Sequence, residues 1–170
     1  EQDTVCSMPG EIVCFDIQVN DFDDIIALGL SLNWDPNVYE YDHLEAFGIP
    51  GLDLSGFGTP TPGFPDVEEG ELTMSWIDLS LEGVTLPDFA IIFTVCLKAV
   101  GAAGTSSPIT FSQTPLEIEA ATIDSTLVPS LLHGFGQISA NCDPMGCDNL
   151  SYTLVTIDPQ CPRDCNGVLN

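Results

Sequence analysis

The run VCFDIQVN at residues 13–20 and the run IALGLSLNW at residues 26–34 decide the fold. In both runs, large apolar side chains alternate with small or polar ones, which is the two-residue period of a strand with one face in a core. The acidic sequence DFDD at residues 21–24 separates the runs and is typical of a turn, and Asp35-Pro36 ends the second run. The two runs therefore predict consecutive strands that each bury one face.

The same alternation recurs further along the chain. It predicts strands at residues 72–76, 91–99, 109–112, 116–121 and 134–140. A long Gly- and Pro-rich loop is expected at residues 47–66, and residues 35–44 have room for one helical turn. Many short strands separated by such turns predict an all-β fold, an antiparallel β-sandwich.

The charge of the chain excludes several classes of protein. Its 170 residues contain 26 Asp+Glu and 2 Lys+Arg, so the formal net charge is −24. A nucleic-acid-binding protein needs cations to replace the counterions of the phosphates, and anionic membrane surfaces repel such a chain. The longest apolar run, residues 89–97, is far shorter than the roughly 18 residues of a membrane span. We therefore expect neither nucleic-acid partners nor membrane insertion.

No motif of an enzyme is present in the sequence. The two histidines, His43 and His133, lie in loop-like contexts, and no nucleophile elbow, zinc-protease helix or phosphate-binding loop occurs. Trp34 and Trp76 could stack on sugars, but both lie on the apolar phase of their strands, which favours a place in the core. We expect a protein with no catalytic residues and no required cofactor.

The acidic turn offers a candidate metal site. Asp21, Asp23 and Asp24 are close in sequence, and Ca²⁺ is bound by six to eight oxygen ligands. The alternative is a solvated turn, because no Asp-x-Asp-x-Asp-Gly loop is present and acids are abundant everywhere in this chain. Ca²⁺ is therefore a possible ligand of this turn and not a required cofactor.

Seven cysteines indicate an oxidising, extracellular environment. Cys142, Cys147, Cys161 and Cys165 follow the pattern C-x4-C-x13-C-x3-C. Two local disulfides are expected from it, with a zinc site as the alternative, although zinc ribbons commonly use C-x2-C pairs. The odd number leaves one cysteine without a partner in the chain, and the sequence does not assign the partner of Cys6.

Several segments, in order, resemble a cohesin-like domain over residues 1–140. They are GEIVCFDIQV at 10–19, IALGLSLNWDP at 26–36, GVTLPD at 83–88, IFTVCLKAVG at 92–101, SPITF at 107–111 and PLE at 115–117. The resemblance implies a jelly-roll sandwich of about nine strands. The form with Cys14 and Cys96 is similar to repeats of very large bacterial surface proteins. It further implies a Cys-containing linker at 141–150 and the start of a following β-module at 151–170.

Cys14 and Cys96 both lie on the polar faces of their predicted strands. If the strands are neighbours in register, a disulfide joins them. If a third strand lies between them, the separation of about 9.5 Å exceeds the roughly 7 Å between Cα atoms that a disulfide spans. Both arrangements are open.

The resemblance implies a non-catalytic structural or adhesive repeat of an extracellular bacterial surface protein or fibre. Its expected partners are neighbouring modules or further copies in a homo-oligomeric assembly. The alternative function is a module that binds polysaccharide or a dockerin.

Overall fold

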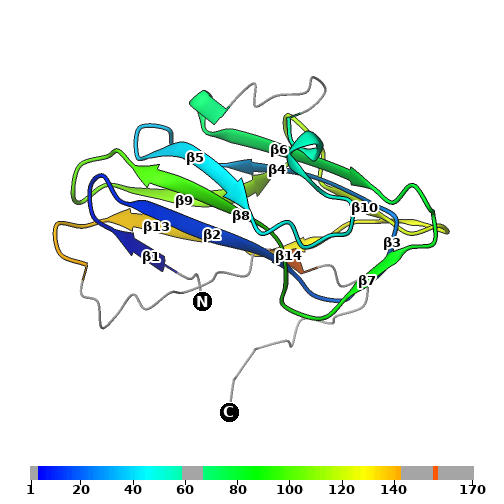
Figure 1. The fold of residues 1–170 in the computed structure, drawn as a ribbon. Coiled ribbons are helices and arrows are strands. Elements are labelled where there is room, and N and C mark those ends of the chain that lie inside the picture. Colours follow the sequence, from blue (N-terminus) through cyan, green and yellow to red (C-terminus); the bar gives the residue numbers. More distant parts are fainter. Residues whose placement is uncertain (1–3, 59–66, 143–154, 157–170) are drawn as a thin grey trace, which may run out of the picture.

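The structure is a computed structural model that describes residues 4–58, 67–142 and 155–156 (Figure 1). Within these residues the chain forms strands and two short 3-10 helices, η1 (Leu54–Gly56) and η2 (Val67–Glu69). The strands build two facing layers, the smaller one in front of the larger one in Figure 1. The predicted class, an all-β antiparallel sandwich of jelly-roll type, is confirmed.

The smaller sheet has the order β2-β8-β5, with every pair antiparallel. It consists of β2 (Ile12–Val19), β8 (Ala90–Ala99) and β5 (Tyr39–Glu45). The predicted inward residues Phe15, Ile17, Phe93 and Val95 are fully buried. β8 is the middle strand and also buries the side chains between them, from Ile92 to Leu97. This sheet contributes one side of the core.

The helical turn expected within residues 35–44 is confined to its start, where the amides of Val38 and Tyr39 both donate to the carbonyl oxygen of Asp35. The rest of this segment is strand β5. Its backbone pairs with β8 from Tyr39, opposite Ala99, to Glu45, opposite Thr94. Tyr39 and Leu44 are buried, while Glu40 is exposed. This strand is hard to predict from its sequence for two reasons. It is rich in acidic side chains, and a β-bulge after Tyr41 breaks its two-residue alternation.

The larger sheet is organised around β4 (Ala27–Asn33). One edge of β4 pairs with β6 (Glu71–Ile77) along its whole length. The other edge pairs with β9 (Ser106–Ser112) and then with β10 (Glu119–Ala121). Three further strands extend this sheet: β13 (Gly134–Ile138), β1 (Thr4–Ser7) and β11 (Thr126–Leu127). β1 is parallel to β13, so the first strand of the sandwich lies directly beside a late one.

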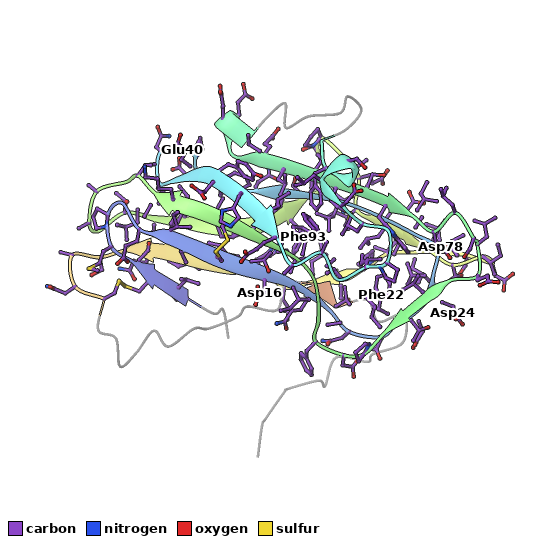
Figure 2. The ribbon with its side chains drawn as sticks, in the orientation of Figure 1. Asp16, Phe22, Asp24, Glu40, Asp78 and Phe93 are labelled. Carbon is purple, nitrogen blue, oxygen red and sulfur yellow. A yellow bond between two sulfur atoms is a disulfide. The ribbon has the colours of Figure 1, made fainter. Side chains whose placement is uncertain are left out.

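The core fills the space between the two layers. The rings of Phe57 and Phe93 meet edge to face with centroids 5.0 Å apart, and Figure 2 shows Phe93 between the sheets. Trp34 and Trp76 are each 5% exposed, which confirms that both belong to the core. Their indole N–H groups donate to the carbonyl oxygens of Tyr39 and Pro50, respectively.

Short strands add to the roughly nine that were expected. Residues 21–24, predicted as a turn, lie largely in β3 (Phe22–Ile25), which pairs with β7 (Val84–Leu86). Phe22 and Ile25 are fully buried and anchor this ribbon. β12 (Ser130–Leu131) pairs with β14 (Val155–Thr156). Apart from Asn141, Cys142 and β14, the expected linker at 141–150 and following module at 151–170 lie outside the described residues.

Candidate functional site

An open groove of about 250 Å³ lies on the outward face of the larger sheet. Its floor includes Ala27 and Gly29 of β4 and Ser75 of β6. These residues face away from the core because Leu28, Leu30 and Trp76, which alternate with them, are buried. A floor of such small side chains lets another backbone approach the sheet closely.

One wall of the groove is a segment that crosses the outer face of β4. The Ser31 hydroxyl donates to the carbonyl oxygen of Leu116 at 2.7 Å and accepts from its amide at 2.9 Å. The amide of Ile118 donates to the side chain of Gln113, which closes the loop. Leu116 and Glu117 therefore stand over the floor beside Gly29, while Ile77 lies on the other side and is 58% exposed.

Cys14 and Cys96 lie directly opposite each other on β2 and β8. Their Cα atoms are 4.0 Å apart, and a disulfide joins them. β2 and β8 are therefore direct neighbours in register, which is the first of the two arrangements that the sequence left open. The disulfide lies on the outward face of the smaller sheet, next to His43 of β5.

A second disulfide joins Cys6 to Cys142, 136 residues apart in sequence. The expectation of local pairing is wrong for Cys142, because the parallel pairing of β1 and β13 brings the two ends of the sandwich together. With its sulfur in this bond, Cys142 is not a zinc thiolate. Cys147, Cys161 and Cys165 lie outside the described residues.

His43 lies on strand β5 and not in the loop that the sequence suggested. Its Nδ1 atom is 2.6 Å from a carboxylate oxygen of Asp42, and its Nε2 atom is 3.7 Å from Glu45. The hydrogen bond to Asp42, helped by the charges of both acids, raises the pKa of His43 above its ordinary value. His133 accepts a hydrogen bond from the amide of Phe111 through Nδ1.

The three candidate calcium ligands do not form a compact cluster. Within the described residues, the one group of three candidate metal-binding side chains within 4.8 Å of one another is Cys14, Glu45 and Cys96. Two of these are disulfide-bonded. The backbone amides of Asp21 and Asp24 donate to the side chains of Asp88 and Thr85, so this acidic stretch helps to hold β3 against β7.

Because the chain has few cations, several of its carboxylates accept hydrogen bonds from backbone amides in loops. The carboxylate of Asp78 accepts from the amides of Ser80 and Gly83, and that of Asp53 accepts from the amide and hydroxyl of Ser55. Hydrogen bonds from these serine hydroxyls and amides lower the pKa of both acids. In Figure 2, Asp24 and Asp78 lie together at one end of the sandwich. Among the described side chains, the ion pairs are those of His43.

Raising the NaCl concentration from 0.01 to 0.5 M is expected to raise the melting temperature by several degrees. With 26 acids and 2 fixed cations, self-repulsion destabilises the folded state, and the screening length falls from about 30 Å at 0.01 M to about 3 Å at 1 M. Differential scanning fluorimetry measures the change. Choline chloride at equal ionic strength is the control, because it shows whether screening produces the rise without sodium ions. A flat response in both salts would contradict the prediction.

No helix in the described part of the chain is long and apolar enough to cross a membrane. No family model and no curated protein matches the chain. The β-sandwich does match solved structures, and three of these show which fold it has.

All three contain cohesins. The first is the complex of CaDoc0917(R16D) with CaCohA2, a protein of Clostridium acetobutylicum. It has a TM-score of 0.63 and 15% identity, over 81% of this chain and 96% of that one. The Coh-OlpA–Doc918 complex of Clostridium thermocellum gives 0.59 and 16%, over 80% and 94%. The seventh ScaB type I cohesin of Pseudobacteroides cellulosolvens gives 0.59 and 15%, over 83% and 90%. The chain therefore has the cohesin fold, as its sequence segments suggested.

Two elements of this surface, the groove floor and its Leu116 wall, were not predicted from the sequence. The small residues Ala27 and Gly29 lie on one face of the second run, and they were the available signal for a groove floor. Nothing in the sequence pattern placed Leu116 over them.

Proposed function

We propose that this domain is a non-catalytic, extracellular protein-binding module whose partner docks in the groove on the outward face of the larger sheet. The groove is the observation that carries the proposal, because a floor of Ala27, Gly29 and Ser75 between the raised side chains of Ile77 and Leu116 suits close contact with another backbone. The cohesin fold supports a protein as the ligand, since two of the similar structures are complexes with dockerins.

The charge around the groove indicates the chemistry of that partner. Glu117 and Glu119 line the groove, and the whole chain carries a net charge of −24. A partner with basic residues around an apolar contact is therefore favoured over an acidic one. We propose a dockerin-type module of this character. The chain's two tryptophans are buried, so they offer no stacking platform for a polysaccharide.

Titration of the domain with a panel of dockerin modules, measured by isothermal calorimetry, tests this proposal. We expect binding to at least one of them, and Ala27→Trp is expected to weaken it at least tenfold by filling the groove. Ala102→Trp is the matched control, because Ala102 is exposed in the turn between β8 and β9. Absence of binding to the whole panel, or equal affinity of both variants, would refute the proposal.

A second role is supported by a different observation. The two disulfides tie the domain together across 136 and 82 residues of sequence, which suits a repeat in a surface protein or fibre that must survive outside the cell. We propose that the module also serves as a structural and adhesive bead in a larger bacterial surface assembly. Imaging of the native material tests this role, and an isolated 170-residue protein without neighbours would contradict it.

A further inference from the structure

The Cys6–Cys142 disulfide joins the beginning of the chain that forms the sandwich to its end. Cys6 lies on β1, the first strand, and Cys142 follows β13 by four residues. The Cα atoms of the two cysteines are 5.8 Å apart, although 136 residues separate them in sequence. The chain between them is therefore a covalently closed loop that contains almost the entire fold.

This connection determines where tension along the chain would travel. A pull that enters before Cys6 and leaves after Cys142 passes from one cysteine to the other through their sulfur atoms. The hydrogen bonds that join β2, β8 and β5, and those that join β4 to β6 and β9, lie inside the closed loop. The strand residues outside the closed loop bear load directly: Thr4 and Val5 of β1, which precede Cys6, and β14, which follows Cys142 and pairs with β12.

We propose that this domain is a force-bearing link in which the Cys6–Cys142 bond carries tension and the part of the sandwich between these cysteines remains unloaded. The groove between Ile77 and Leu116 lies within the closed loop, so its shape is independent of the tension. A pulled chain would then keep its partner-binding surface folded. This inference rests on the covalent connection and not on the identity of any partner.

The second disulfide gives the proposal a quantitative signature. Cys14 and Cys96 lie inside the loop and lock 82 of its 136 residues. If the outer bond is absent, about 54 residues are free to extend, which at about 3.6 Å per residue is about 19 nm. If both bonds are absent, all 136 residues extend, which is about 49 nm.

Single-molecule pulling of the full 170-residue chain between handles at its two ends tests the proposal. Under oxidising conditions, the intact protein is expected to show no lengthening step from the chain between Cys6 and Cys142. Cys6→Ser/Cys142→Ser is expected to show a step of about 19 nm, and adding Cys14→Ala/Cys96→Ala to lengthen it to about 49 nm. The chain beyond residue 142 contributes equally to all three proteins. Cys147→Ser is the matched control and should behave like the intact protein.

A step of 19 nm or more in the oxidised intact protein would overturn the proposal. So would a non-reducing peptide map that links Cys6 to a cysteine other than Cys142. If the serine variants do not fold, the intact protein is held under tension while a reductant is added. The sandwich is then expected to extend only after reduction, and extension before it would be the contrary result.

Discussion

Replacing Cys14 and Cys96 with alanine is expected to lower the free energy of unfolding by about 4 kcal/mol, the value that the chain-entropy model gives for a loop of this size. The bond closes a loop of 82 residues, so its loss gives the unfolded chain many more conformations. For a chain of 170 residues, this corresponds to a fall of about 8 to 16 °C in melting temperature. Urea unfolding under non-reducing conditions measures it.

Asp16→Ala/Thr94→Ala is the matched control for this experiment. The two residues form the cross-strand pair two positions along the same strands, and the Thr94 hydroxyl donates to the Asp16 carboxylate at 2.6 Å. Their double substitution removes a hydrogen bond and keeps the disulfide, which is expected to cost about 1 kcal/mol. If the cysteine variant loses no more stability than this control, the disulfide does not constrain the unfolded chain as we argue.

The regular strands of the sandwich could be predicted because a strand that is buried on one face alternates apolar and polar residues with a period of two. β2, β4 and β6 bury the apolar face that their alternation predicts, while β8 buries Ile92 to Leu97 without interruption. Each of the four strands was predicted within a few residues. β5 was not, because its bulge after Tyr41 breaks the period. β3 was not predicted either, because its acidic residues are typical of a turn. The side chains that accept hydrogen bonds from this acidic stretch, Thr85 and Asp88, lie far along the chain.

The covalent and surface features depend on contacts that are distant in sequence. Seven cysteines allow many pairings, and local spacing alone cannot assign them. Cys6 can bond to Cys142 because β1 pairs in parallel with β13. No sequence pattern within either segment predicts that pairing. Likewise, the groove wall exists because Ser31 binds Leu116, 85 positions away.

Gly70→Ala is expected to destabilise the protein by more than about 4 kcal/mol, which puts it among the most damaging single substitutions. Gly70 lies between η2 and β6 with φ +81°. A Cβ atom there would lie 2.2 Å from the carbonyl oxygen of Trp34. The two backbones cannot separate easily, because the amide of Trp34 donates to the carbonyl oxygen of Gly70 at 2.8 Å. The substitution must therefore disturb the ends of β4 and β6 at once.

Gly51→Ala isolates this steric effect from the cost of the backbone conformation. Gly51 has nearly the same φ, +79°, but a Cβ atom there would meet nothing within 4 Å. Alanine at this position is expected to cost only the left-handed conformation, about 1 to 2 kcal/mol. Chemical unfolding of both variants measures the difference. Equal destabilisation would mean that conformation, and not the close approach of Trp34 to Gly70, determines the need for glycine at the start of β6.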